Sequence, residues 1–308
     1  MRNAFAAELV VAAERDPRVV LLSGDIGNRL FDSFKQAYPD RFFNCGVAEA
    51  NMMGVAAGLA MSGLRPVVYT IVPFVTTRCL EQIRVDVCYP RQPVTIVGVG
   101  GGLSYASLGA THHACEDLGF LRLLPEMSIL CPADPLEVRA AVRAALAHDG
   151  PVYLRLGKKG EPVIHEHEPD LRIGGSLPVR PGTDIAILAV GHVLPLALDI
   201  ATRLEEQGLS TRVDSFPCVK PLDEACLTEV FDQCRLVATL EEHSVVGGVG
   251  NAVAAWLAAR PDPPVARLAT FGTADRFLHD AGSVGFARRA LGLDGEAIAA
   301  ALAARARR

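Results

Sequence analysis

The sequence lacks the features of a membrane protein and of a nucleic-acid binder. No apolar stretch reaches about 18 residues without a charge, a glycine or a proline, so no membrane-spanning helix is expected. The first residues begin an amphipathic pattern, and no apolar segment with a cleavage site follows them. Lysine and arginine form no dense run except the RARR end, and the formal net charge is -5. These absences argue against a membrane span and against a general nucleic-acid-binding role.

The eight cysteines include no C-x-x-C pair and lie mostly inside apolar runs. Reduced, buried thiols of this kind indicate a cytoplasmic protein rather than a disulfide-rich secreted one. One candidate metal cluster is the group His112, His113 and Cys115, but no second set of ligands accompanies it at a matching spacing. We therefore expect no metal site formed by this chain.

A chain of 308 residues, half of them hydrophobic, is long enough for two ordinary domains. Apolar strands alternate with helical segments in both halves, which is typical of parallel sheets covered on both faces. Residues 157–181 interrupt this alternation with weak periodicity and clustered charges. We predict an α/β protein with two doubly wound, mainly parallel sheets: a first domain at 1–160, a linker at 161–182 and a second domain at 183–308.

The periodicity of apolar residues places the individual elements. Strands are predicted at 19–23, 41–43, 65–71, 93–99, 127–131, 152–156, 184–190, 210–215, 235–240 and 265–270. Helices are predicted at 1–15, 32–37, 49–61, 75–87, 114–123, 135–147, 194–207, 223–231, 248–259 and 296–303.

Glu49 is the one acid in the stretch 42–58, which is otherwise apolar, small or amide-bearing. A carboxylate without a partner in such a place would lose much of its hydration, so it should be protonated, paired or used in chemistry. The predicted helix 49–61 begins at this residue, and the dipole of a helix favours negative charge at its N-terminus. A purely electrostatic role at the helix end is the structural alternative.

Ligands of open parallel sheets bind beyond the carboxyl ends of the strands. In the first domain, the loops at that edge carry Asp25, Glu49, Phe74, Arg155 and the glycine-rich segment 100–113 with its two histidines. This mixture suits a small, polar, anionic ligand. Structural alternatives exist: Phe74 could belong to the core, and Arg155 could pair with an acid on a neighbouring helix.

Two motifs near the histidines have other interpretations. Thr111 could cap the following helix and make the nearby acids first-turn charges, but this leaves His112 and His113 unexplained. The run VGVGGG at 97–102 lacks a G-x-G-x-x-G spacing into an immediate helix, which argues against a nicotinamide-nucleotide site.

Seven motifs follow one another along the chain: FFNCGVAE at 42–49, YTIVPF at 69–74, EQIR at 81–84, GATHH at 109–113, CPAD at 131–134, YLRLGK at 153–158 and LEEHSVVGGVG at 240–250. In this order they resemble the C-terminal half of a transketolase, and more closely the separate C-terminal subunit of split, two-chain transketolases. The resemblance covers nearly the whole chain, and its motifs are specific in combination.

The resemblance implies a thiamine diphosphate enzyme that transfers a two-carbon ketol unit between sugars or sugar phosphates. This chain would supply its pyrimidine-binding domain and its C-terminal domain. Glu49 would be catalytic, because it would hydrogen-bond the ring nitrogen of the aminopyrimidine and so promote loss of the thiazolium C2 proton. Phe74 would stack on the aminopyrimidine, and Ile71 and Asp25 would complete this part of the cofactor site.

The resemblance also implies the residues that contact the substrate. His112 would be catalytic, at the sugar hydroxyls or the nascent alkoxide, with His113 beside it. Arg155 would bind the phosphate of a sugar phosphate, because a forked guanidinium matches that group.

The chain departs from the family at three positions. Many transketolases have a phenylalanine in place of Ile71, an acid in place of Leu108 and a phosphate-binding histidine near Gly100. The last two differences predict a substrate whose hydroxyl pattern or charge differs from that of ordinary pentose and hexose phosphates.

The motif that holds the cofactor's diphosphate is missing. Thiamine enzymes bind the diphosphate through Mg²⁺ with a Gly-Asp-Gly motif and a later asparagine, and Asp25 lies outside any such context. We therefore expect an N-terminal partner subunit to hold Mg²⁺ and the diphosphate, with the active site at the interface of an α2β2 assembly.

Other functions fit parts of this pattern. The beta subunit of a 2-oxo-acid dehydrogenase has the same two-domain plan, cofactor and acid, although Thr111, His112 and Arg155 favour ketol transfer. The single-chain 1-deoxyxylulose-5-phosphate synthases would require the missing half to be encoded separately. A non-catalytic scaffold subunit that kept the fold is the alternative from a different class.

Overall fold

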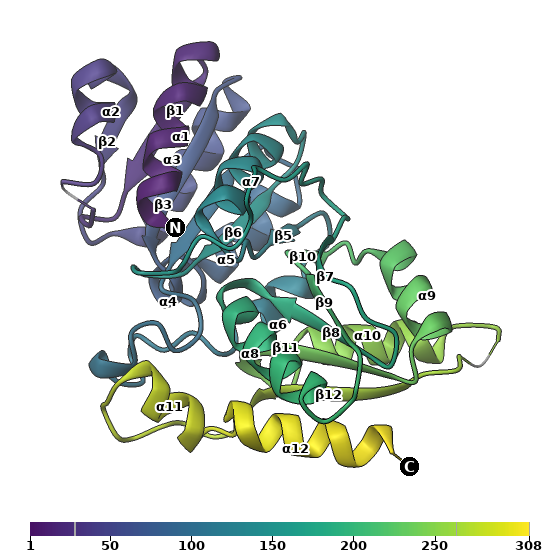
Figure 1. The fold of residues 1–308 in the computed structure, drawn as a ribbon. Coiled ribbons are helices and arrows are strands. Elements are labelled where there is room, and N and C mark those ends of the chain that lie inside the picture. The colour runs from purple at the N-terminus through teal and green to yellow at the C-terminus, as the bar shows by residue number, and fades with distance from the viewer. Residues whose placement is uncertain (28, 263, 308) are drawn as a thin grey trace.

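The computed structural model describes residues 1–27, 29–262 and 264–307 and contains two α/β units, each built around its own sheet. Figure 1 shows the two units one above the other, with α11 (Val284–Ala290) and α12 (Gly295–Ala306) along the outer edge of the second. Both sheets are mainly parallel, so the predicted fold class is confirmed. Within the described ranges, no helix combines the length and the apolarity needed to cross a bilayer.

The first sheet has seven strands in the order β10-β5-β6-β4-β3-β1-β2. Its neighbours pair in parallel except at β10, which runs antiparallel to β5. Strands β1, β4, β5 and β6 are buried along their whole length, because helices cover both faces of the sheet. The strands are β1 (Val19–Ser23), β2 (Phe42–Asn44), β3 (Arg65–Ile71), β4 (Thr95–Val99), β5 (Ser128–Leu130), β6 (Val152–Leu156) and β10 (Cys218–Lys220).

Two groups of helices cover the faces of this sheet. The helices α1, α2 and α7 pack on one face, where Phe5, Phe34 and Val138 enter the core. The helices α3, α4 and α6 pack on the other face, where Met52 and Leu118 are fully buried. The helices are α1 (Arg2–Arg15), α2 (Asp32–Ala37), α3 (Glu49–Met61), α4 (Val72–Val75), α5 (Leu80–Gln82), α6 (Asp117–Arg122) and α7 (Pro135–Ala147).

The second sheet has five strands in the order β12-β11-β8-β9-β7, with β7 antiparallel to β9. The helices α8 and α12 cover one face, and α9 and α10 cover the other. Its elements are β7 (Leu177–Arg180), β8 (Ile185–Val190), α8 (Leu194–Glu205), β9 (Thr211–Ser215), α9 (Glu224–Gln233), β11 (Leu236–Ser244), α10 (Val249–Ala258) and β12 (Arg267–Thr273).

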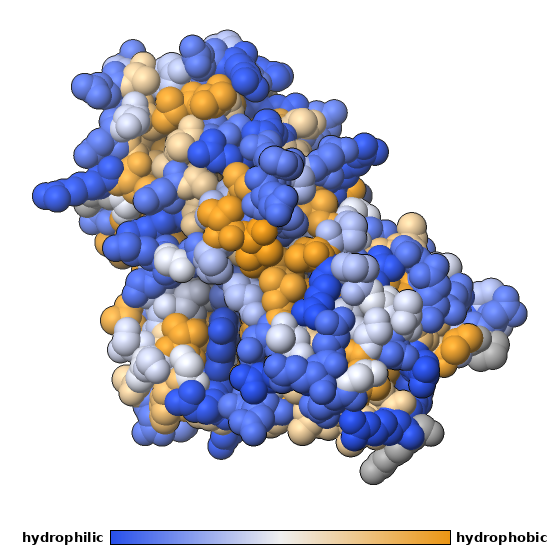
Figure 2. All heavy atoms as spheres, viewed as in Figure 1, coloured by the Kyte–Doolittle hydropathy of each residue, from blue (hydrophilic) through white to orange (hydrophobic). Residues whose placement is uncertain are grey.

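The two units share buried surface. One core cluster runs from the α3 face of the first sheet to the α9 and α10 face of the second. Strand β10, which follows β9 along the chain, joins the first sheet, and Lys220 Nζ donates to the carbonyl oxygen of Arg122 at 3.0 Å. Figure 2 shows apolar surface gathered at the junction of the units on the face viewed. The second unit is therefore fixed against the first, and the loops at their junction can contact both units.

Three elements were not predicted. Strand β7 lies within the predicted linker 161–182, and β10 and α11 were absent from the predicted elements. The two strands have four and three residues and pair antiparallel at or near sheet edges. Such short segments carry too little periodicity to be recognised without their pairing partners.

The predicted helix 75–87 is divided in the structure. After α4 the chain forms a 3-10 turn at Thr77–Cys79, then α5, then a π-helical turn at Ile83–Cys88. Thr76 contributes to the break, because its hydroxyl donates to the carbonyl oxygen of Val72 at 2.6 Å, and this kind of bond bends helices. The segment after β3 is therefore irregular at the edge where ligands are expected.

Asp134, in the CPAD motif, is fully buried at the N-terminus of α7. Its Oδ1 accepts from the backbone nitrogens of Leu136 and Glu137, both at 2.8 Å. Its Oδ2 accepts from those of Ile164 and His165, at 2.9 and 3.0 Å. One carboxylate thus caps the helix and fixes the start of the segment that leads to the second unit.

We expect Asp134→Ala to lower the free energy of unfolding by about 2–4 kcal/mol, because it removes a cap and leaves buried N–H groups unpaired. Asp294→Ala is the matched control: Asp294 caps α12 through one bond, to the nitrogen of Ala297, and should cost only about 1 kcal/mol. Urea unfolding of the two variants measures the difference. Equal losses would contradict the dual role of Asp134.

Candidate active site at the carboxyl end of the first sheet

Glu49 begins α3 at the carboxyl end of β2, and only 5% of the residue is exposed. Gly46 turns the chain before it with a φ of +66°. Gly24 allows the neighbouring strands to approach, because a Cβ there would lie 3.5 Å from Glu49 Cγ and 3.2 Å from Thr70 Oγ1. The fold therefore holds the Glu49 carboxylate in an enclosed niche at the sheet edge.

Glu49 is paired with Arg78, a residue that the sequence analysis missed. Arg78 Nη1 lies 3.2 Å from Oε1 and 3.3 Å from Oε2 of Glu49. The side chain of Arg78 is 48% exposed, so the pair has one buried and one half-exposed member. The available signal was the spacing: Arg78 follows Phe74 by four residues in a segment of helical character, which places both on one side of the chain.

Phe74 lies between Arg78 and His112. The Cζ atom of Arg78 is 3.9 Å from the centroid of the Phe74 ring, above its face. The His112 ring meets Phe74 at a centroid distance of 5.3 Å and an interplanar angle of 68°. The ring of Phe74 is half-buried and does not belong to the core clusters of the described chain, so the core alternative for this residue is not supported. The three predicted residues thus form one contact group: Arg78 contacts both Glu49 and Phe74, and Phe74 contacts His112.

The loop that carries the histidines is fastened at its base. Gly102 and Ala114 exchange two backbone hydrogen bonds, of 2.9 and 3.0 Å, which close the segment between them. Within it, the Thr111 hydroxyl lies 2.9 Å from Nδ1 of His112. Burial lowers the pKa of His112, and Coulombic repulsion from Arg78 and His113 lowers it further. At neutral pH the imidazole is therefore uncharged and able to accept a proton.

Tyr105 and Lys158 extend this group along the sheet edge. Gly100 has a φ of +84°, and a Cβ there would lie 2.0 Å from a ring carbon of Tyr105, so Tyr105 fills the space beside it. The Tyr105 ring is 6.0 Å from the His112 ring, and Lys158 Nζ is 4.5 Å from the Tyr105 centroid. Lys158 is thus a partly exposed cation next to the histidine loop.

Arg155 is placed differently from the prediction that it binds a substrate phosphate. The residue is 3% exposed, and its Nε and Nη2 atoms pair with the two oxygens of Asp117 at 2.8 and 3.0 Å. Nη2 also donates to the carbonyl oxygens of Ala114 and Glu242. The structural alternative, an ion pair with an acid on a neighbouring helix, is therefore what the structure shows. Arg155 supports the base of the histidine loop from below.

The LEEHS motif of β11 completes this support. Glu242 is fully buried, accepts from the backbone nitrogen of Leu103 at 2.8 Å and contacts His192 Nε2 at 2.7 Å and Arg288 Nε at 2.5 Å. Burial alone would raise the pKa of Glu242, but His192 and Arg288 hold it well below its usual range. The neighbouring Glu241 accepts from the first backbone nitrogens of α10. This motif is structural, and it ties the second unit to the glycine-rich loop.

Asp25 and Ile71, predicted in the cofactor site, lie at the same edge without joining the central group. Asp25 is exposed, adopts a left-handed φ of 56° and accepts a hydrogen bond from Asn44 Nδ2 at 2.9 Å. Ile71 is half-buried against the core on the α1 face of the sheet. His113, predicted to contact substrate, has Nε2 3.4 Å from the carbonyl oxygen of Ala106.

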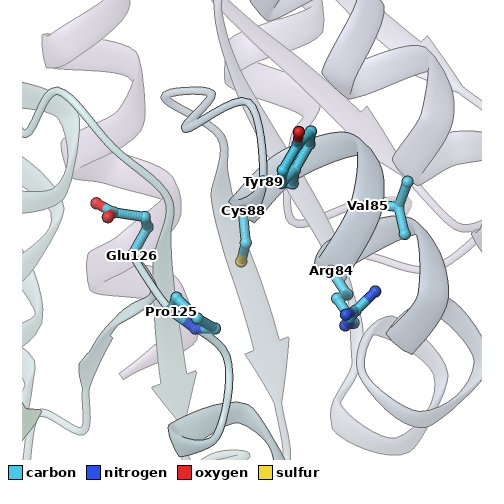
Figure 3. Close-up of a pocket in the computed structure, with 6 residues that line it drawn as sticks. All are labelled: Arg84, Val85, Cys88, Tyr89, Pro125 and Glu126. Atoms are coloured by element: carbon cyan, nitrogen blue, oxygen red, sulfur yellow. The ribbon is translucent and has the colours of Figure 1, made fainter.

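Of the predicted site residues, His113 lines a hollow of about 290 Å³, together with Cys115, Glu116 and residues 273–278. Another hollow lies away from the predicted site residues. This depression, of about 510 Å³, lies between the π-helical turn and the loop before β5, and Figure 3 shows the side chains that line it. Its lining consists of Arg84, Val85, Cys88, Tyr89, Pro125 and Glu126, which include none of the predicted site residues. In the part of the chain that the structure describes, no three His, Cys, Asp or Glu side chains cluster as metal ligands would.

Two family models match this chain. Residues 1–161 match the transketolase pyrimidine-binding domain, and residues 174–282 match the transketolase C-terminal domain. Together the models cover the first unit, including the sheet edge that carries Glu49, Phe74 and His112, and the second unit up to the segment before α11.

Similar proteins are known in bacteria. The chain is 34% identical over 264 residues to an apulose-4-phosphate transketolase subunit of Phocaeicola vulgatus, covering 85% of each chain. It is 35% identical over 269 residues to the 6-deoxy-6-sulfo-D-fructose transketolase subunit SqwH of a Clostridium species, covering 87% of this chain and 84% of the relative.

A solved structure described as a split gene transketolase, inactive beta4 tetramer, superposes with a TM-score of 0.87 at 35% identity. The superposition covers 99% of this chain and 97% of that one. The agreement of both domain models, of full-length relatives and of a full-length structure confirms the resemblance predicted from the motifs. This chain belongs to the transketolase family.

Proposed function

We propose that this chain is the C-terminal, pyrimidine-binding subunit of a thiamine diphosphate-dependent transketolase, which transfers a two-carbon ketol unit between sugars. One observation carries the proposal: the contact group of the buried Glu49 carboxylate, the Phe74 ring and the uncharged His112 imidazole. Family membership supports the class of reaction, and this group supplies side chains that such a reaction needs.

The residues of the niche fit the aminopyrimidine of the cofactor. Glu49 offers a buried carboxylate to a ring nitrogen, and Phe74 offers an aromatic face. Thr70 Oγ1 is buried beside Glu49 and has no hydrogen-bond partner among the described residues. When bound, thiamine diphosphate supplies the electron sink that lets a carbon–carbon bond beside a carbonyl break and form again. Glu49 would hold a proton at the ring nitrogen.

His112 would move protons of the substrate. Burial is the main reason why the pKa of the imidazole is lowered, which favours its uncharged form at neutral pH; in the free chain, repulsion from Arg78 and His113 lowers this pKa further. It would accept a proton from a sugar hydroxyl while the ketol unit leaves and return it to the acceptor. The bond between Thr111 and Nδ1 orients the ring for this transfer.

The substrate would be an anionic sugar, and Lys158 would bind its charged group. The two relatives described above carry a phosphate and a sulfo group in the names of their substrates. Lys158 is a partly exposed cation next to Tyr105 and the histidine loop, whereas the donors of Arg155 are engaged in the interior. We therefore transfer the anion-binding role from Arg155 to Lys158.

A partner subunit would complete the site. Apolar side chains are exposed before and along α3: Val47, two residues before Glu49, is 74% exposed, and Val55 and Met61 farther along the helix are 43% and 60% exposed. An N-terminal subunit that covers this face would bring the Mg²⁺ and diphosphate site, for which this sequence has no Gly-Asp-Gly motif. Both relatives described above are named as subunits of transketolases, which supports this division, and an α2β2 assembly would follow.

Glu49→Gln is expected to lower kcat of the reconstituted complex by at least about 100-fold, because an amide cannot exchange a proton with the ring nitrogen. Steady-state assays of ketol transfer between sugar phosphates measure the effect. Glu14→Gln, an exposed acid on α1, is the control and should keep the wild-type kcat. An unchanged kcat in Glu49→Gln would identify a non-catalytic scaffold. Release of CO2 from a 2-oxo acid without ketol transfer would identify a dehydrogenase subunit.

Lys158→Met is expected to raise KM for a phosphorylated sugar by about 10- to 100-fold, with kcat within about threefold of wild type, because a charge-assisted contact to the anion is lost. The KM for the same sugar without its phosphate should stay constant. Lys159→Met, which changes the exposed neighbouring lysine, is the control. If both variants behave like the wild type, another residue or the partner binds the anion.

A further inference from the structure

Arg78 contacts both Glu49 and Phe74. Its guanidinium is planar, stacks over Phe74 with Cζ 3.9 Å from the ring centroid, and directs Nη1 to both oxygens of Glu49. The proposed function assigns the same two contacts, a stack on Phe74 and an N–H directed at Glu49, to the ring of thiamine diphosphate. An aminopyrimidine ring that is hydrogen-bonded to Glu49 and stacked on Phe74 would occupy the same space as this guanidinium.

We infer that Arg78 occupies the aminopyrimidine seat, meaning the space between Glu49 and Phe74 in which the aminopyrimidine ring would bind. The cofactor must displace the Arg78 guanidinium from this space in order to bind. The inference rests on the proposed function and concerns how the seat is kept before the cofactor arrives. It assigns to Arg78 a role outside the chemistry: it stabilises the empty site and competes with the cofactor.

The geometry of the pair suits an occupant that leaves. A single nitrogen serves both oxygens at 3.2 and 3.3 Å, whereas Arg155 pairs with Asp117 through two nitrogens at 2.8 and 3.0 Å. Half of the Arg78 side chain faces solvent, so the guanidinium can be rehydrated when it leaves. Its backbone lies in the 3-10 turn between α4 and α5, an irregular segment of the chain.

The empty site needs such an occupant because of Glu49. The carboxylate is 5% exposed, and it is the only charged group on an otherwise apolar helix. Without a positive or N–H-bearing partner, its ionised form would be buried and uncompensated. Arg78 supplies that partner in the free chain, and the cofactor ring would supply it in the holoenzyme. The two partners are mutually exclusive, so each must weaken the binding of the other.

This competition is tested by isothermal titration calorimetry, in which thiamine diphosphate with Mg²⁺ is titrated into the reconstituted complex and Kd is measured. Arg78→Ala should lower Kd by about five- to tenfold, because the cofactor no longer has to displace a bound group. Arg78→Lys should give an intermediate Kd, since an ammonium reaches Glu49 without stacking as a plane. Arg84→Ala, an exposed arginine of the same segment, should leave Kd unchanged.

A second readout does not depend on the cofactor. Arg78 is one of the charges that lower the pKa of His112, so Arg78→Ala should raise that pKa in an NMR titration of the free chain, whereas Arg84→Ala should not. This result verifies that the guanidinium occupies the seat in solution. An unchanged His112 pKa would overturn the inference.

The outcomes separate this inference from the proposed function. If the wild-type complex binds the cofactor and Arg78→Ala binds it equally or more weakly, Arg78 is not a competing occupant and the inference fails alone. If neither complex binds thiamine diphosphate, the proposed function fails with it.

Discussion

The contact between the Glu49 carboxylate and a planar N–H-bearing group above Phe74 is the interaction on which this site depends. Glu49 is buried at the edge of the first sheet because the chain turns at Gly46 and because Gly24, which has no side chain, lets Thr70 and Glu49 lie close to the backbone. A buried carboxylate requires a hydrogen-bonded partner, and the niche admits one that is flat enough to lie on an aromatic ring. The niche therefore favours a planar group that carries N–H donors, as the guanidinium of Arg78 does.

The second unit serves this interaction at a distance. Through Glu242 it binds the backbone of Leu103, and through the same residue's carbonyl it holds Arg155. Arg155 in turn holds the carbonyl of Ala114, at the other end of the histidine loop. Both ends of the loop that presents His112 are thus fixed by one buried network that spans the two units. This explains why an arginine at the edge of a parallel strand need not contact ligand.

Much of this was predictable from sequence because local rules and global fold agree. Burial on both sheet faces gives continuous apolar strands, and the bounds of β1, β3 and β6 follow directly from them. The position of Glu49 was predictable because an acid is rare in so apolar a run. The interaction partners of individual side chains were harder to predict. The sequence allowed Arg155 either to contact a ligand or to pair with an internal acid, and only the position of Asp117 in the structure distinguishes the two. Short edge strands such as β7 depend on pairing, which a single sequence does not display.

The glycine at position 100, one of the departures from the family pattern, has a steric consequence in this structure. A side chain at Gly100 would collide with Tyr105, whose ring carries the ammonium of Lys158. Any residue that reached the substrate from position 100 would therefore displace Tyr105 and move Lys158 with it. Glycine at position 100 therefore leaves room for the Tyr105 ring, and Lys158 lies over that ring. Under the proposed assignment, the anion would be bound from the end of β6, where Lys158 lies, rather than from the end of β4, where Gly100 lies.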